Sequence, residues 1–221
     1  MRNSTIRALM IAATLAFGGA AAGPAAAEDG IGAVQKVEKT VYGTVPQAAR
    51  APMRVKDNVV AQELLETAED SAVQIRFADR SQLTLGADAR IVVEEFAFVP
   101  DSADGKALFR ISAGALRWVS GDLPEGGIAF ATPSADLVLK DANIAIRVTP
   151  NGDTLVAVAA GEVDVTVKAT GKTGTIVAGE SLLISPTEVK AISTGIAATG
   201  DRIVDLGWPA PAMGDNSGSD K

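Results

Sequence analysis

The sequence of 221 residues contains neither cysteine nor histidine. Without cysteine the chain forms no disulfide bond and has no thiol nucleophile. Without histidine it lacks the side chain that most often transfers protons in enzymes. The ordinary ligands of zinc, copper, haem and iron–sulfur clusters are therefore missing as well. These absences predict a protein that is not an enzyme and that binds no metal or cofactor.

Aromatic residues and positive charge are also scarce. Aromatic residues make up 4% of the chain and apolar residues 47%, so we expect a core built mainly from Val, Ile, Leu and Ala. There are 20 Lys and Arg residues against 27 Asp and Glu, which leaves a net charge of −7. Such an acidic protein does not favour phosphate backbones or anionic lipid surfaces. The composition therefore predicts no nucleic-acid partner.

Long apolar runs are absent except near the N-terminus. There, Arg2 and Arg7 precede an apolar run at residues 8–17, and small residues follow up to Ala27. This pattern is typical of a secretory signal peptide, with cleavage expected before Glu28. Cleavage removes two positive charges and no negative ones, so the net charge changes from −7 to −9. An uncleaved membrane anchor is the alternative, but the run is short for a bilayer span. We expect an exported protein, periplasmic or secreted, without a membrane span after cleavage.

The rest of the chain contains short apolar strands separated by turns. In residues 72–77 and 82–85 apolar side chains alternate at period two around the corner Asp79-Arg80-Ser81. Similar units recur to about residue 195, with turn residues every few positions. This pattern predicts an all-β fold, an antiparallel double-sheet sandwich that is jelly-roll-like. A parallel β-solenoid is the alternative, because glycines recur after strands, although no fixed repeat period supports it.

Two segments of this pattern carry more specific expectations. Residues 90–98 (RIVVEEFAF) are expected to form a strand with Val92, Phe96 and Phe98 on one face. Residues 55–69 are ambiguous, because Asp57 could cap a short helix or lie in the turn of a strand pair. The β-rich surroundings favour the strand pair. We expect four parts in the chain: a signal peptide at 1–27, a strand and loop at 28–54, a β domain at 55–195 and an extension with a tail at 196–221.

Few residues suggest chemistry. Glu94 and Glu95 are adjacent in a strand, so they are expected to face opposite sides and to form no carboxylate pair. Asp101 and Asp104 lack the spacing and the bidentate glutamate of a calcium loop. Ser81 has no base nearby in the sequence, so we interpret it as a turn residue whose side chain bonds the backbone.

Several segments, taken in order, have the character of one known domain. They are residues 72–91 (AVQIRFADRSQLTLGADARI), 108–121 (LFRISAGALRWVSG), 130–148 (FATPSADLVLKDANIAIRV), 154–165 (TLVAVAAGEVDV) and 177–184 (VAGESLLI). This series resembles the FecR domain of bacterial envelope proteins. The resemblance implies structural turn and core roles for Phe77, Asp79, Ser81, Leu83, Leu85, Gly114, Thr132, Pro133, Gly161 and Gly179. Two departures are visible: Arg80 stands where glycine is usual, and residues 141–144 (DANI) stand where an Arg-Gly-Thr motif is usual.

The resemblance implies a non-catalytic binding or structural module of the cell envelope. Its partner would be another envelope protein, contacted through a sheet edge or one face of the sandwich. In well-known members the domain follows a cytoplasmic anti-sigma segment and a membrane helix, so this chain is expected to be a stand-alone exported version. An accessory sensor in envelope signalling is one alternative. Carbohydrate or cell-wall polymer binding is another, for which only Tyr42, Trp118 and Trp208 offer suitable rings.

Overall fold

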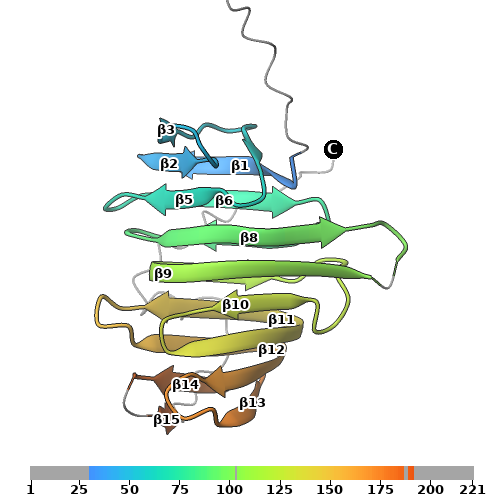
Figure 1. Ribbon diagram of the computed structural model, residues 1–221, viewed down its shortest axis with the longest axis vertical. Coiled ribbons are helices and arrows are strands. Elements are labelled where there is room, and N and C mark those ends of the chain that lie inside the picture. Colours follow the sequence, from blue (N-terminus) through green and yellow to red (C-terminus); the bar gives the residue numbers. More distant parts are fainter. Residues whose placement is uncertain (1–29, 103, 187–188, 192–221) are drawn as a thin grey trace, which may run out of the picture.

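The computed structural model describes residues 30–102, 104–186 and 189–191 (Figure 1). The signal peptide expected at 1–27 and the extension expected at 196–221 lie outside these described residues. Within them every regular element is a β-strand. No described segment is a helix with the length and apolar character that a membrane span needs.

Fifteen strands are present in the described part. They are β1 (Gly32–Glu38), β2 (Val41–Thr44), β3 (Ala51–Pro52), β4 (Asn58–Val59), β5 (Leu64–Thr67), β6 (Ala72–Phe77), β7 (Gln82–Leu85), β8 (Arg90–Phe98), β9 (Gly105–Val119), β10 (Ile128–Ala131), β11 (Ala135–Val148), β12 (Thr154–Val167), β13 (Thr173–Val177), β14 (Ser181–Ile184) and β15 (Val189–Ala191). The ambiguous residues 55–69 therefore form the short strands β4 and β5, and the helical alternative is wrong.

The strand pairs divide into two layers, which we name layer A and layer B. Layer A contains β2, β3, β5, β8, β10 and β13, and layer B contains β1, β4, β6, β7, β14 and β15. Strands β9, β11 and β12 contribute one half to each layer and connect the two layers into one mixed sheet. In Figure 1 the strands follow one another along the long axis, from β1–β3 at one end to β13–β15 at the other.

The long strands change layer at residues with left-handed backbone. In β9 the change is at Gly114 (φ 86°), and in β12 it is at Gly161 (φ 74°). In β11 it is at Asp141 (φ 44°), inside the segment that stands where the family has Arg-Gly-Thr. Asp tolerates this conformation better than most residues, so the bend can form without glycine.

An aromatic cluster fills the space between the two layers. The Phe77 ring, from β6 in layer B, stacks on Phe96 from β8 in layer A, with a centroid distance of 5.0 Å. Phe109 lies 5.0 Å from Trp118 and 4.9 Å from Phe130, again between ring centroids. Val, Ile, Leu and Ala side chains extend this core along the whole sandwich.

The pairing confirms the predicted all-β, antiparallel double-sheet fold. Every strand pair in the described part is antiparallel except β9 with β10. A parallel solenoid needs parallel pairing between successive coils, so the pairing does not support that alternative. β1 and β2, in the segment expected to precede the β domain, pair with β6 and β5 and extend both layers.

Val92 does not share the inward face of β8 with Phe96 as expected, and the cause is a β-bulge. The register with β9 shifts between Val93 and Glu95. Ile91 and Val93 are buried before the bulge, and Phe96 points inward after it, whereas Val92 is only half-buried. One extra residue in the strand reverses the alternation, so a strict period of two cannot describe the whole strand.

Candidate functional site

Hydrogen bonds among polar side chains and the backbone stabilise the corner between β6 and β7. Asp79 Oδ1 accepts hydrogen bonds from the Ser81 backbone N at 3.1 Å and from Ser81 Oγ at 2.5 Å. Both side chains are fully buried, and Asp79 Oδ2 has no partner in the described part of the chain. Phe77 also lies buried before the corner, and Leu83 and Leu85 lie buried after it. These two side chains therefore stabilise the turn.

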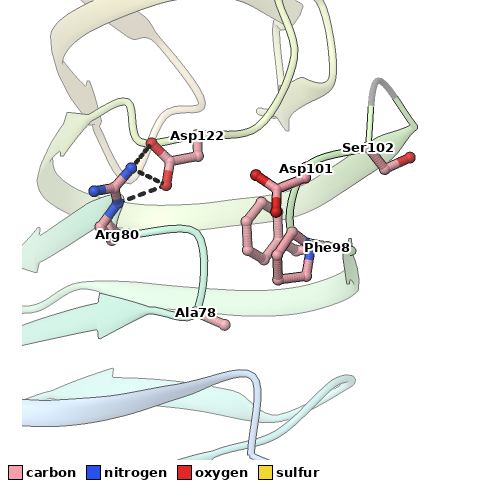
Figure 2. Close-up of a pocket in the computed structure, with 7 residues that line it drawn as sticks. Ala78, Arg80, Phe98, Asp101, Ser102 and Asp122 are labelled. Atoms are coloured by element: carbon pink, nitrogen blue, oxygen red, sulfur yellow. Dashed lines mark hydrogen bonds and ion pairs between the residues drawn. The ribbon is translucent and has the colours of Figure 1, made fainter.

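Arg80 at the tip of this corner has the backbone conformation of a glycine. Its φ is 68°, which explains why glycine suits the position. Its guanidinium makes a two-pronged ion pair with Asp122, with Nε–Oδ2 and Nη2–Oδ1 distances of 2.5 Å (Figure 2). The Asp122 backbone N donates to Asp79 O at 2.7 Å, and a Cβ on Gly121 would overlap the backbone of Asp79 and Ser81. The corner is thus fastened to the loop that follows β9.

A cleft with a volume of about 550 Å³ lies beside the corner between β6 and β7. Three loops and the end of β8 supply its lining, which consists of Ala78, Arg80, Phe98, Pro100, Asp101, Ser102 and Asp122 (Figure 2). The volume is within the range of small-molecule sites. However, Arg80 and Asp122 neutralise each other, and Ser102 Oγ accepts a hydrogen bond from the Asp104 backbone N at 3.0 Å. Among the described lining residues, no hydrogen bond joins Ser102 Oγ to a carboxylate.

We expect Arg80→Gly to change the free energy of unfolding by less than about 1 kcal/mol. The substitution relieves the left-handed strain, about 1 kcal/mol, and loses an exposed ion pair, about 0.2–1 kcal/mol. Urea denaturation measures the difference. Arg80→Ala is the control, since it loses the ion pair and keeps the strain, and it should be the less stable of the two. A loss of several kcal/mol in Arg80→Gly would contradict this account.

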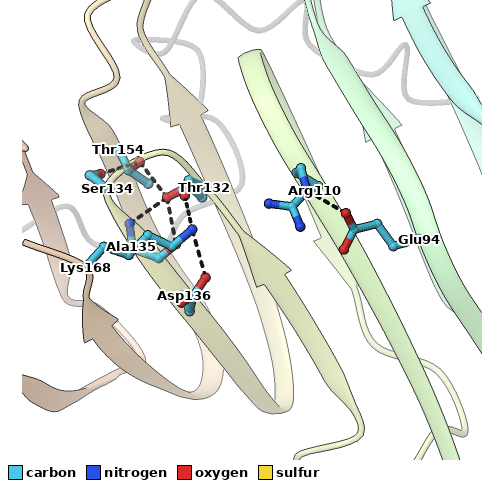
Figure 3. Close-up of polar contacts among 8 residues, drawn as sticks. All are labelled: Glu94, Arg110, Thr132, Ser134, Ala135, Asp136, Thr154 and Lys168. Atoms are coloured by element: carbon cyan, nitrogen blue, oxygen red, sulfur yellow. Dashed lines mark hydrogen bonds and ion pairs between the residues drawn. The ribbon is translucent and has the colours of Figure 1, made fainter. Parts of the chain in front are cut away.

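The Thr132-Pro133 stretch forms a second turn that side-chain hydrogen bonds stabilise, between β10 and β11 (Figure 3). Thr132 Oγ1 accepts from the Ala135 backbone N at 3.0 Å and from Thr154 Oγ1 at 2.9 Å. Ser134 Oγ lies 2.7 Å from Thr154 Oγ1 and 3.0 Å from Ile184 O. The three hydroxyl side chains are buried, whereas Pro133 is exposed. They fasten the corner to β12 and β14, and we assign them a structural role.

The glycines that the resemblance marks lie at bends. Gly114 and Gly161 are the positions where β9 and β12 change layer, and Gly179 (φ 89°) is in the turn before β14. The structure therefore distributes the marked residues over several corners and does not gather them at one site.

The outer face of layer A is covered by ion pairs. Its cations each have an acidic neighbour: Arg90 with Glu66 at 3.1 Å, Lys106 with Glu95 at 2.9 Å, Arg110 with Glu94 at 2.5 Å, Lys140 with Asp164 at 2.9 Å and Lys168 with Asp136 at 3.1 Å (Figure 3 shows two of them). Hydrogen bonds from Thr175 and Lys140 lower the pKa of Asp164, and the bond to Glu94 raises the pKa of Arg110. Such exposed pairs are typical of a solvated surface.

These pairs also correct the expectation for Glu94 and Glu95. Both carboxylates bind cations of the neighbouring strand β9 on the outer face, and neither points into the core. The bulge in β8 is the cause, because it places two successive residues on one side. Among the described residues, no group of three or more acidic side chains gathers as a metal site would require.

Glu63, between β4 and β5, is an acid in an apolar setting. Its side chain is buried, and its Oε2 accepts from the Val60 backbone N at 3.0 Å. Burial raises the pKa of Glu63 above the ordinary value; the Val60 hydrogen bond opposes this, and the charge of Asp57 adds to it. A Cβ on Gly43 would overlap the carboxylate, so that glycine leaves room for it.

This raised pKa predicts a pH dependence of stability. The folded protein holds the Glu63 proton more tightly than the unfolded chain, so the free energy of unfolding falls as pH rises from the ordinary glutamate pKa through the raised one. Glu63→Gln should remove this decline. The measurement is urea denaturation over a pH series, with the exposed Glu69→Gln as the control. Identical pH profiles for the wild type and Glu63→Gln would refute the assignment.

Comparison with known proteins finds a matching family and similar solved structures. Residues 63–164 match the family described as FecR protein. No curated protein matches the sequence. Two crystal structures of a proposed anti-sigma factor from Parabacteroides distasonis ATCC 8503, at 1.65 and 2.50 Å resolution, are similar with a TM-score of 0.46 and with 16% and 14% identity. Each similarity covers 58% of this chain and 57% of the other, so the match extends over little more than half of either protein. Residues 63–164, a little less than half of the chain, are therefore similar to the FecR family.

Proposed function

We propose that this protein is a non-catalytic binding module of the bacterial cell envelope and that it acts by contact with another envelope protein. One observation carries the proposal. In this FecR-like domain the buried polar side chains form hydrogen bonds that stabilise the domain's own turns. Asp79, Ser81 and Thr132 serve the fold, so recognition is left to the exposed surfaces. FecR domains are associated with envelope signalling, and a role as an accessory sensor is the regulatory form of this proposal.

The proposal includes export and a particular organisation of the chain. Residues 1–27 direct export and are removed before Glu28, and the mature protein works in the periplasm or is secreted. Residues 28–54 lead into a β domain that ends near residue 195, and residues 196–221 form an extension. The pattern of charge and apolar residues at the N-terminus supports the export step.

Carbohydrate binding receives less support. Trp118 is fully buried among Phe77, Phe109 and Phe130, so its ring cannot stack on a sugar. The half-buried Tyr42 ring carries the Arg50 guanidinium 3.5 Å from its centroid. Trp208 lies outside the described residues. Neither described ring is thus an open platform for a polymer.

In-cell photocrosslinking tests the proposal. A crosslinking amino acid is placed at single exposed positions on each outer face of the full chain, in its native bacterium, and adducts are identified by mass spectrometry. We expect a discrete adduct with one envelope protein from neighbouring positions of one face. Retention of the protein in the cytoplasm, or no adduct from any position, would overturn the proposal. Sedimentation with purified peptidoglycan would favour polymer binding instead.

A further inference from the structure

The outer face of layer B is cationic, in contrast to that of layer A. The outward positions of adjacent strands form a continuous row, in which Gln74 pairs with Thr84, Thr84 with Arg117, Arg117 with Ala145 and Ala145 with Ala157. Arg147 lies two residues from Ala145 on β11 and Arg76 two residues from Gln74 on β6, both on the same outward side. We name the surface around these three arginines the arginine face.

Acidic side chains are missing from the outward strand positions of the arginine face. In the described part of layer B, Asp and Glu are absent from the outward positions of six strands. These are β6, β7 and β14, together with the layer B halves of β9, β11 and β12. None of the ion pairs formed by described residues includes Arg76, Arg117 or Arg147. Arg117 Nε donates a long hydrogen bond of 3.4 Å to Asn143 Oδ1. This segregation occurs in a protein with a net charge of −7.

The chemistry of the face suits carboxylates. A guanidinium binds a carboxylate through two parallel hydrogen bonds, and Arg is favoured over Lys where such recognition is needed. Arg76 is exposed, while Arg117 and Arg147 are half-buried. In the neighbouring strands Arg117 lies opposite Ala145, and Arg147 lies opposite Leu155. All three arginines therefore keep at least part of their surface exposed.

The dimensions indicate the size of the occupant. The face runs over the strands β6, β7, β9, β11, β12 and β14. At roughly 4.8 Å between strands, these six strands extend over about 24 Å. An extended segment of about seven residues covers this length, at about 3.3 Å per residue. Long polyanions and lipid bilayers would also meet the acidic remainder of the protein, which repels them.

We propose that the arginine face binds a short acidic segment of a partner protein. This inference rests on the proposed function, because it names the surface and the partner chemistry of the same protein–protein contact. The acidic segment lies across the strands of layer B, with its carboxylates on Arg76, Arg117 and Arg147. Layer A, whose cations are already paired, takes no part.

The test uses the full-length exported chain and a fluorescein-labelled peptide of eight residues that alternates glutamate and leucine. Fluorescence anisotropy at low salt should show binding that weakens as salt rises. The variant R76Q/R117Q/R147Q should weaken binding at least 10-fold. The matched control R110Q/K140Q/K168Q removes the same charge from layer A and should leave binding within 2-fold. Equal losses in both variants would overturn the proposal, and urea midpoints establish that both variants are folded.

Other occupants are outcomes of the same experiment. Equal or tighter binding of 20-nucleotide single-stranded DNA, or of phosphatidylglycerol vesicles, would overturn the proposal in favour of a general polyanion surface. A variant of the full chain tests whether this protein's own C-terminal segment occupies the arginine face. It carries Asn in place of Asp201, Asp205, Asp215 and Asp220. Peptide binding that tightens markedly in that variant would identify this segment as the occupant and would overturn the partner proposal.

Crosslinking separates failure of this inference from failure of the proposed function. An adduct formed from arginine-face positions and lost in R76Q/R117Q/R147Q supports both. An adduct formed only from layer A, or one that persists in that variant, overturns the arginine-face inference while the proposed function stands. Absence of any adduct from either layer counts against both.

Discussion

Replacing Gly114 with alanine is expected to lower the free energy of unfolding by about 2–5 kcal/mol. The residue has a φ of 86°, which costs a non-glycine residue about 1–2 kcal/mol. In addition, a Cβ at this position would overlap the Ala89 backbone, so β9 and its surroundings must shift; overpacking of this kind costs about 1–3 kcal/mol. Because β9 passes from one layer to the other at Gly114, the shift affects both layers. Urea or thermal denaturation measures the loss.

Gly179 provides a matched control for this prediction. Its φ of 89° is nearly the same, but an added Cβ would meet no atom within 4 Å. Gly179→Ala should therefore cost only the conformational strain, about 1–2 kcal/mol. Equal losses in the two variants would show that the contact with Ala89 relaxes freely and that backbone conformation alone makes glycine necessary at the bend.

Phe77→Ala should destabilise the protein by about 3–5 kcal/mol, the usual cost of removing a buried phenylalanine. The ring is 3% exposed and contacts Phe96, Phe109 and Trp118, so its loss leaves a cavity at the point where the two layers meet. Urea denaturation of the folded variant gives the value. The cost should lie well above that of an exposed substitution because rigid neighbouring rings cannot fill the space.

Phe98→Ala serves as the comparison for Phe77→Ala. Phe98 is half-buried and lines the cleft at the β6–β7 corner, so truncation there should cost distinctly less than truncation of Phe77. A near-neutral Phe77→Ala would mean that the aromatic cluster contributes little to stability. It would also mean that the inward face of β6 has been assigned incorrectly.

Much of the fold follows from local patterns. The alternation of Val73, Ile75 and Phe77 with polar neighbours specifies which face of β6 is buried, because successive side chains of a strand point in opposite directions. The corner at Asp79 was also predictable, since Asp and Ser side chains bond nearby backbone groups. Even the positive φ at Arg80 could be anticipated from the glycine that is usual there.

The bulge in β8 could not be predicted from such patterns. The strand RIVVEEFAF contains acceptable alternation in either register, and only the pairing with β9 introduces the bulge that places Glu94 and Glu95 on the same face. The Arg80–Asp122 ion pair was equally inaccessible, because its members are 42 positions apart in the sequence. Contacts of this kind depend on which strands become neighbours in the sheet, and the local sequence pattern does not specify the strand order.

The sequence by itself determined the acidic charge, the absence of cysteine and histidine, and a β-rich domain that resembles the FecR family. These properties depend on composition and on short-range spacing. Only the tertiary structure decided which layer each strand joins, and therefore which charges share a face. Arg76, Arg117 and Arg147 are ordinary strand residues in the sequence, and they become one surface because β6, β9 and β11 place them on the same side of layer B.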